Sequence, residues 1–208
     1  MSTLITLLLL HATASIPTLL SDTLDHTLLV DSLRATRTVL VPYQAEIEAA
    51  AASAHLPAAL LAGVIQEESR FEPFATRAEA RYMRSKRVRR AAARWCATHR
   101  TSASVFTELL DRSRSYGLTQ IMGETAREQG FANTYLAELY LPRNALEHGA
   151  LLLHRLLVRY HDDTLAAISA YNQGTARKHR GVFVNARYVY RVTLAWRAYE
   201  RLFHERGG

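Results

Sequence analysis

The clearest hydrophobic pattern in the chain is an apolar stripe with helical spacing in residues 56–71. Its members are Pro57, Leu60, Leu61, Val64 and Ile65. Because residues three and four positions apart share one face of a helix, the stripe predicts an amphipathic helix whose next inward position is Glu68. Glu67 is rotated by about 100° from that position and is expected to reach water. The pattern therefore places the carboxyl group of Glu68 on the apolar side of a helix.

Helical spacing continues through most of the chain. Strand-like alternation is confined to a short stretch around 181–184, and no internal repeat is visible. The pattern predicts helices over 43–53, 57–72, 78–112 (as two helices), 123–129, 144–160, 164–171 and 185–203. The fold is therefore expected to be mainly α.

Size and composition narrow the chemistry. A chain of 208 residues suits one domain with its own core. Cys96 is the only cysteine, so no disulfide can form within the chain. The sequence contains no Cys/His spacing for zinc, no H-E-x-x-H and no glycine-rich phosphate loop. No cofactor or metal is expected.

The position of Glu68 is suited to acid catalysis. A carboxyl group held against apolar neighbours resists ionisation, so its pKa should rise. A raised pKa is what a general acid needs near neutral pH. The alternative is a glutamate at a helix end that simply extends into solvent. Two downstream segments favour the catalytic interpretation.

Motifs along the chain resemble those of a known family. The main ones are Glu68-Ser69-Arg70-Phe71, Tyr116-Gly117-Leu118-Thr119-Gln120-Ile121-Met122 and Ala170-Tyr171-Asn172-Gln173-Gly174, supported by Leu141-Pro142-Arg143-Asn144-Ala145 and Tyr188-Val189. Their order and spacing resemble the soluble lytic transglycosylase (SLT) domain, whose fold is related to goose-type lysozyme. The resemblance runs from about residue 43 to about 195, and implies one lysozyme-like catalytic domain over 43–208. Thr119 and Gly123 depart from the family, which usually has Met and Pro there.

The resemblance implies a substrate and roles for particular residues. The substrate would be the glycan strands of peptidoglycan, cut between N-acetylmuramic acid and N-acetylglucosamine. Glu68 would act as general acid and then as base, giving a 1,6-anhydromuramic product. The residues implied to hold the substrate or the acid are Ser69, Gln120, Tyr171, Asn172 and Tyr188. Each also has an ordinary alternative, such as a helix cap, a solvated loop side chain or a core tyrosine.

Two other functions stay open at this point. A hydrolytic lysozyme would need a second carboxylate, and the candidates are Glu72, Glu79, Asp111, Asp162 and Asp163. The other possibility is a non-enzymatic module that binds polyanions.

The polyanion possibility comes from an insertion at about 75–115. Phe71 and Tyr116 are 45 positions apart, and phage-type members of the family carry long insertions at this place. Residues 77–100 hold nine arginines and lysines against Glu79 alone, whereas the whole chain has a net charge of +7. Such a segment attracts anionic polymers by a salt-sensitive field, or is simply a solvated helix. No specific nucleic acid is expected as a partner.

The N-terminal segment, residues 1–42, has two interpretations. An apolar run at 4–10 followed by Ala12-Thr13-Ala14 is typical of a secretory signal, but no lysine or arginine precedes it. Otherwise the run is a helix packed on the domain, with a connector helix after it. The expected location is the cell envelope or periplasm, or a phage virion.

Overall fold

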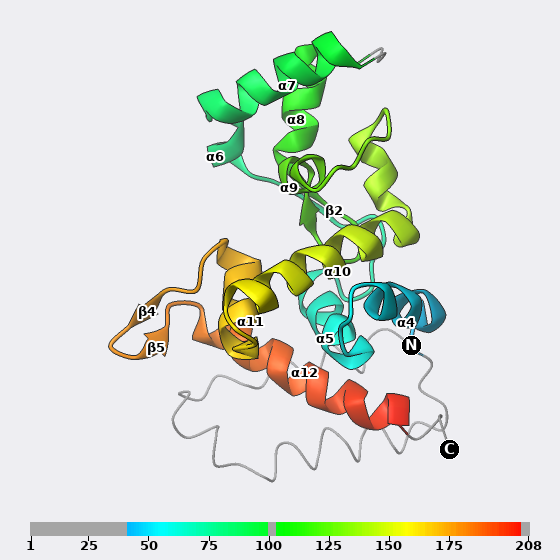
Figure 1. Cartoon of the computed structure of the whole chain (residues 1–208), viewed down its shortest axis with the longest axis vertical. Helices are drawn as coiled ribbons and strands as arrows, with labels where there is room; N and C mark the ends of the chain where they lie inside the picture. Colours follow the sequence, from blue (N-terminus) through cyan, green and yellow to red (C-terminus); the bar gives the residue numbers. More distant parts are fainter. Residues whose placement is uncertain (1–40, 100–102, 205–208) are drawn as a thin grey trace.

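The computed structural model describes residues 41–99 and 103–204, and most of them are helical (Figure 1). The expectation of a mainly α fold is confirmed. The predicted signal and connector helix of the N-terminal segment lie in residues 1–40, outside the described residues. Among the described residues, no single helix is long and apolar enough to cross a membrane. The consecutive helices Gln44–Ser53 and Ala58–Glu68 reach that length and hydropathy only when they are taken together, and the chain bends by 119° between them.

Five helices form the main body of the protein. They are α4 (Gln44–Ser53), α5 (Ala58–Glu68), α10 (Pro142–Arg159), α11 (Thr164–Gln173) and α12 (Ala186–His204). The middle of this group is α5, in which every residue from Ala59 to Ile65 is buried. The main core packs around it and includes Ile47, Leu60, Leu61, Ile65, Leu118, Leu146, Leu153, Ile168 and Val192.

Helices α5 and α12 come into unusually close contact at Gly63. A Cβ atom there would lie 2.8 Å from the backbone nitrogen of Trp196 and 3.0 Å from the carbonyl oxygen of Val192. Only glycine allows two backbones to approach so closely. This contact brings the start of α12 against the end of α5, where the acid motif lies.

A second group of elements stands above the main body (Figure 1). It contains α6 (Ala80–Met83), α7 (Lys86–Thr98), α8 (Val105–Arg112), α9 (Gly123–Glu128) and the 3-10 helix η1 (Leu136–Tyr140). We call α6, α7 and α8, residues 80–112, the basic lobe. The prediction of two helices over 78–112 was wrong, because the chain breaks at Arg84–Ser85 and Ser85 caps a separate helix by accepting from the backbone N–H of Val88.

A small antiparallel sheet joins the basic lobe to the main body. Its strands β1 (Thr76–Ala78), β2 (Arg114–Tyr116) and β3 (Ile121–Met122) lie in the order β1-β2-β3, with Arg77 opposite Ser115 and Tyr116 opposite Ile121. The sequence pattern did not predict these strands. The brief strand-like stretch that it did predict is present as the hairpin of β4 (Lys178–His179) and β5 (Val182–Phe183), which extends away from the helices (Figure 1).

Buried ion pairs fix the basic lobe on α9. Arg112 donates to Glu108 at 2.9 Å and to Glu124 at 2.7 Å, and Arg127 donates to Glu108 at 2.9 Å. The Cζ atom of Arg127 also lies 3.7 Å from the ring centre of Trp95, which belongs to α7. Because each buried charge has a partner, the network joins α7, α8 and α9 without an orphaned ion.

The caps of two helices test the sequence interpretation in detail. Helix α11 begins at Thr164 as predicted, where Asp163 accepts from the backbone N–H of Ala166 at 2.9 Å, and it ends two residues beyond the predicted 171, with Gly174 at a φ of 78°. Helix α10 instead begins at Pro142, two residues before the predicted start at Asn144. Proline suits the first turn, where its missing N–H costs nothing.

Candidate active site

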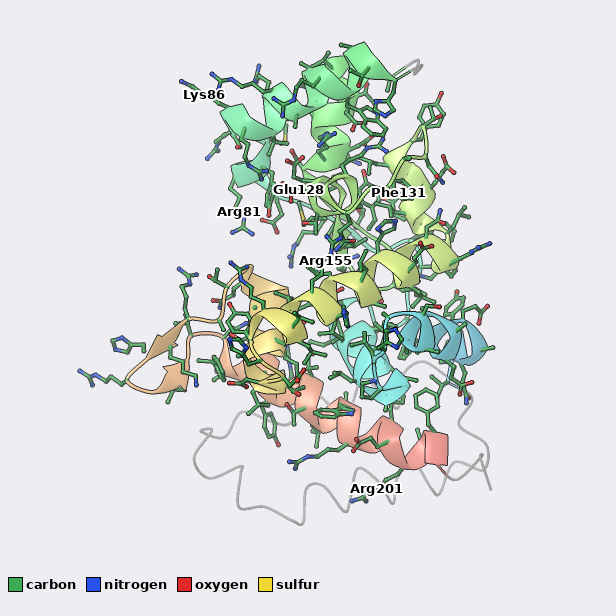
Figure 2. All side chains as sticks on the ribbon, viewed as in Figure 1. Arg81, Lys86, Glu128, Phe131, Arg155 and Arg201 are labelled. Atoms are coloured by element: carbon green, nitrogen blue, oxygen red, sulfur yellow. The ribbon has the colours of Figure 1, made fainter. Side chains whose placement is uncertain are left out.

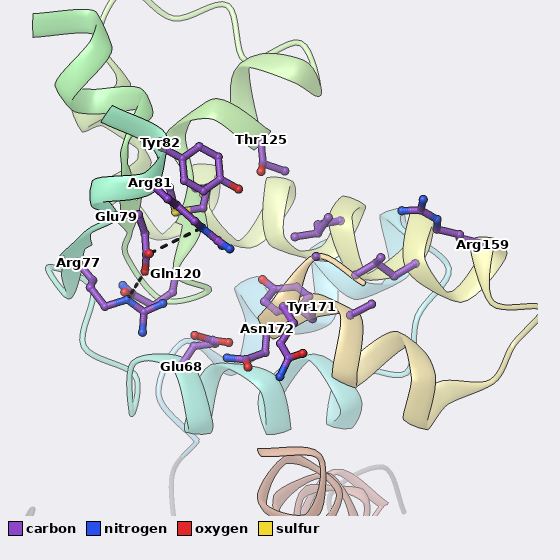
Figure 3. Close-up of a pocket in the computed structure, with 16 residues that line it drawn as sticks. Glu68, Arg77, Glu79, Arg81, Tyr82, Gln120, Thr125, Arg159, Tyr171 and Asn172 are labelled. Atoms are coloured by element: carbon purple, nitrogen blue, oxygen red, sulfur yellow. Dashed lines mark hydrogen bonds and ion pairs between the residues drawn. The ribbon is translucent and has the colours of Figure 1, made fainter. Parts of the chain in front are cut away.

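Glu68 is the last residue of α5 and lines a cavity between the main body and the basic lobe (Figure 3). The cavity has a volume of about 300 Å³. Its walls come from β1 and the basic lobe, the β2–β3 loop, α9, α10 and the end of α11. The lining residues are Glu68, Arg77, Glu79, Arg81, Tyr82, Gln120, Met122, Thr125, Leu152, Leu156, Arg159, Ala170, Tyr171, Asn172, Gln173 and Gly174.

The carboxyl group of Glu68 has a pKa close to neutral pH. Burial raises its pKa from 4.5 to about 7. The hydroxyl of Tyr188 donates to Oε1 of Glu68 at 2.6 Å, and this bond together with the charge of Arg77 opposes part of the rise. The charge of Glu67 adds to it. Near neutral pH the group is therefore present in both protonation states, as sequence analysis expected for a general acid.

Tyr188 reaches Glu68 from the first turns of α12. Its side chain is buried, and burial raises the pKa of its hydroxyl well above the usual value. The hydroxyl therefore stays protonated and acts as a permanent donor to the carboxylate. The two residues are 120 positions apart, and the close contact at Gly63 is what allows them to meet.

Glu67 does not face water as the helical wheel suggested. Its carboxylate pairs with Nη2 of Arg191 on α12, and only 14% of its side chain is exposed. The wheel fails here because α12 covers this side of α5 as well. The Glu67–Arg191 pair keeps a second negative charge beside Glu68 without placing it in the cavity.

Gln120 lines the cavity, but its side-chain amide is used by its own loop. Its Nε2 donates to the carbonyl oxygens of Ala75 at 2.8 Å and Gly117 at 3.0 Å, and its Oε1 accepts from Ser115 at 2.7 Å. The residue has a φ of 48°, a conformation that is rare for residues with a side chain and needs support from its surroundings. Sequence analysis implied that Gln120 holds the substrate. In the structure, both N–H donors of its side-chain amide instead bind backbone carbonyl oxygens and hold the β2–β3 loop.

Ser69 also binds this loop rather than the carboxyl group of Glu68. Its hydroxyl donates to the carbonyl oxygen of Leu118 at 2.7 Å, and Ser69 is not among the residues that line the cavity. The loop is fixed from below as well, because the hydroxyl of Thr119 donates to the carbonyl oxygen of Ala145 at 2.7 Å. Thr119 also packs directly on Gly149. A Cβ atom added at Gly149 would lie only 2.4 Å from the Cβ atom of Thr119.

Tyr171 and Asn172, at the end of α11, lie beside Glu68 (Figure 3). The hydroxyl of Tyr171 donates to the carbonyl oxygen of Thr119 at 2.9 Å. Asn172 accepts through Oδ1 from Nδ2 of Asn185 at 3.1 Å. Nδ2 of Asn172 forms no hydrogen bond with another residue of 41–99 or 103–204, so its two donors are open to a ligand in the cavity. The structure thus gathers Glu68, Tyr188, Gln120, Tyr171 and Asn172 around one place.

Of the five candidates for a second carboxylate, Glu79 lines the cavity with Glu68. It accepts from Nε of Arg77 at 2.9 Å, and its other oxygen lies 4.0 Å from Nε of Arg81. Glu72, Asp111, Asp162 and Asp163 are not among the lining residues. No group of three or more His, Cys, Asp or Glu side chains in the described parts of the chain could hold a metal ion.

Sequence reasoning missed several residues of the cavity. Arg77, Arg81 and Tyr82 carried no expected role in the site, yet together with Glu79 they form the wall opposite α11 (Figure 3). No local pattern could reveal this, because the wall exists only after β1 pairs with β2. Asn185, which orients Asn172, carried no sequence signal either.

Comparison with known proteins agrees with this geometry. The family model described as "Transglycosylase SLT domain" matches residues 45–186. No curated protein matches the chain significantly.

Proposed function

The chain belongs to the transglycosylase SLT domain family, and from this premise we propose that it cleaves peptidoglycan glycan strands as a lytic transglycosylase. The bond cut is the one between N-acetylmuramic acid and N-acetylglucosamine. The observation that supports this most is the buried carboxyl group of Glu68, with a pKa of about 7 and a hydrogen bond from Tyr188.

In the first step Glu68 acts as the general acid. Its carboxyl proton passes to the bridging oxygen of the N-acetylglucosamine leaving group as the bond from that oxygen to C1 of the muramic residue breaks. Positive charge develops at C1, and the 2-acetamido group of the same residue stabilises it. A pKa near the working pH suits this role, because an acid must be protonated to act and still release its proton readily.

In the second step the same group acts as the base. The Glu68 carboxylate takes the proton from the C6 hydroxyl of the muramic residue, and O6 closes on C1. The product has a 1,6-anhydro ring, the enzyme regains its proton, and no water is consumed. Tyr188 stabilises the carboxylate between the two steps, because its hydroxyl donates to the ionised form.

Mass spectrometry of fragments released from purified sacculi tests this proposal. Anhydromuramic fragments are lighter than hydrolysis products by about 18 Da, because hydrolysis adds one water at the reaction centre. The Glu68→Gln variant is the control for contaminating activity and should release nothing. Reducing muramic ends as the main product would contradict the transglycosylase assignment.

Glu79 favours one second candidate, a hydrolytic muramidase. It lines the same cavity as Glu68, and a second carboxylate could activate water on the other face of the sugar. The ion pair with Arg77 and the nearby Arg81 oppose this role, because the Glu79 carboxylate is directed at these guanidinium groups rather than at a water on the sugar. If Glu79→Gln abolished cleavage and wild-type products were hydrolytic, the muramidase assignment would hold.

We further propose that the outer face of the basic lobe holds the enzyme on an anionic polymer of the cell wall. Its cations are Arg84, Lys86, Arg89, Arg90 and Arg94, all exposed and none paired with any described residue. Figure 2 shows Lys86 pointing away from the rest of the molecule. Arg87 does not belong to this face, since it pairs with Glu124 and Glu128. Such a role would require the protein to act in the cell envelope or from a phage virion.

Binding to sacculi at increasing salt tests the role of this face. Exposed charges are screened over about 8–10 Å at moderate ionic strength, so binding should weaken steeply with salt. Replacing Arg89, Arg90 and Arg94 with Gln should flatten that dependence and leave cleavage of a short soluble glycan nearly unchanged. An equal loss on short and polymeric substrates would show that the face acts through the fold instead.

A further inference from the structure

Two arginines of the cavity wall come from the segment that the family motifs do not include. Arg77 lies on β1 and Arg81 on α6, and both line the cavity that contains Glu68 (Figure 3). Their side chains are 64% and 66% exposed. Exposed guanidinium groups on a cavity wall are open to a ligand, so these two groups are candidates for binding the substrate.

Glu79 forms ion pairs with both guanidinium groups through their Nε atoms, with a hydrogen bond to Arg77 alone. Nε of Arg77 donates to one carboxylate oxygen at 2.9 Å, and Nε of Arg81 lies 4.0 Å from the other. In residues 41–99 and 103–204, no other carboxylate forms an ion pair with either arginine. The terminal Nη groups therefore keep their donors for a ligand.

Arg81 has a second support. Its Cζ atom lies 5.1 Å from the ring centre of Tyr82, and Tyr82 packs against the small apolar cluster inside the basic lobe. A guanidinium held on an aromatic ring and beside a carboxylate loses less freedom when it binds. These two contacts partly preorganise the guanidinium group of Arg81.

The charge on this wall selects the chemistry of the ligand. Two guanidinium groups face one carboxylate, and Arg159 adds a further cation to the cavity. The N-acetylated sugar rings of a glycan strand are neutral and supply no counter-charge. A carboxylate supplies the negative counter-charge, and its two oxygens match the paired N–H donors of a guanidinium group.

Peptidoglycan carries carboxylates on one side of the muramic residue. The lactyl group at C3 ends in a free carboxylate where the stem peptide has been removed. Where the peptide remains, its residues supply the carboxylates. We propose that Arg77 and Arg81 form a binding site for a carboxylate on the C3 substituent of a muramic residue, which makes the enzyme prefer carboxylated strands. This inference rests on the proposed function.

Kinetics on matched substrates test the carboxylate site. Four glycan preparations are compared: strands with stem peptides, strands stripped of peptides by an amidase, and each of these two with its carboxylates capped as amides. The test variant is Arg81→Gln. Arg77→Gln is less suitable, because the charge of Arg77 also acts on Glu68. The matched control is Arg197→Gln, an exposed arginine on α12 that neither lines the cavity nor belongs to the outer face of the basic lobe.

Arg81→Gln should raise KM more than it lowers kcat, and it should do so on uncapped strands. The ratio of wild-type to variant kcat/KM should be about three to ten times larger on uncapped than on capped strands, a modest factor because exposed ion pairs are weak. The uncapped preparation that shows the larger ratio identifies the source of the carboxylate. An equal ratio on capped and uncapped strands, or the same effect from Arg197→Gln, would overturn the proposal.

A binding measurement separates this inference from the proposed function. If the wild-type protein cuts no glycan, the proposed function fails, and calorimetry with soluble muropeptides then decides the inference by itself. Uncapped fragments should bind more tightly than capped ones to wild type and to Glu68→Gln, and Arg81→Gln should remove that difference. Equal binding of capped and uncapped fragments would refute the carboxylate site whatever the activity.

Discussion

Replacing Glu68 with glutamine should stabilise the protein at alkaline pH while it removes activity. In the folded protein burial raises the pKa of Glu68 from 4.5 to about 7. Between pH 4.5 and about pH 7, Glu68 is ionised in the unfolded chain but keeps its proton in the native state. The free energy of unfolding therefore falls as the pH rises through this range. Glutamine does not ionise, and its Oε1 still accepts a hydrogen bond from Tyr188.

The size of this effect follows from the shift in pKa. A rise from 4.5 to about 7 corresponds to about 3 kcal/mol at a pH above both values. Below about pH 4.5 both states are protonated and the difference vanishes. The variant should therefore match the wild type near pH 4.5 and exceed its free energy of unfolding by about 2–3 kcal/mol near pH 8.

Urea denaturation of both proteins across this pH range measures the difference. Glu46→Gln, at an exposed position on α4, is the matched control for the chemical change. In parallel, turnover of glycan strands by Glu68→Gln should fall by about two or more orders of magnitude. A stability difference that stays constant with pH would refute the reasoning about burial. Half the wild-type turnover would refute the assignment of the acid.

Two further changes test the surroundings of the acid. Tyr188→Phe removes the bond that favours ionised Glu68, so the pH at which activity declines should move upward and kcat should fall about tenfold; an unchanged pH–rate profile would contradict this. Arg127→Met leaves one side of the buried Glu108 carboxylate without its partner and should cost about 3–5 kcal/mol, measured by urea denaturation. A loss below about 1 kcal/mol would mean that the network relaxes around the gap.

Most of the helices and the inward position of Glu68 could be predicted from the sequence because both depend on local spacing. The stripe ending at Glu68 is set by helical periodicity alone, and the caps at Asp163 and Gly174 lie beside the residues they serve. The environment of Glu67 could not be predicted in this way. Its position on the helix was right, but the partner that covers it, Arg191, lies 124 residues away.

The sheet and the cavity wall depend on pairing between distant segments. Strands β1, β2 and β3 have two or three residues each, too few to show a period. Strand β1 forms because residues some forty positions apart meet, as Thr76 does with Tyr116. This meeting also supplies the carbonyl oxygen of Ala75 that accepts from the amide of Gln120. The net charge of the basic segment was visible in the sequence. Its division into paired and free cations was not.

The buried ion pairs explain how an inserted segment can take part in a precise site. The lobe that carries Arg81 is joined to α9 through Glu108, Arg112 and Arg127, all almost fully buried. Tilting the lobe would separate these charges within a medium of low polarity, which costs far more than separating exposed pairs. Since α9 directly follows β3 and the loop of Gln120, the same network that fixes the lobe also fixes it relative to Glu68. A wall so attached keeps the backbone that carries Arg81 at a fixed place relative to Glu68, which a flexible insertion could not do.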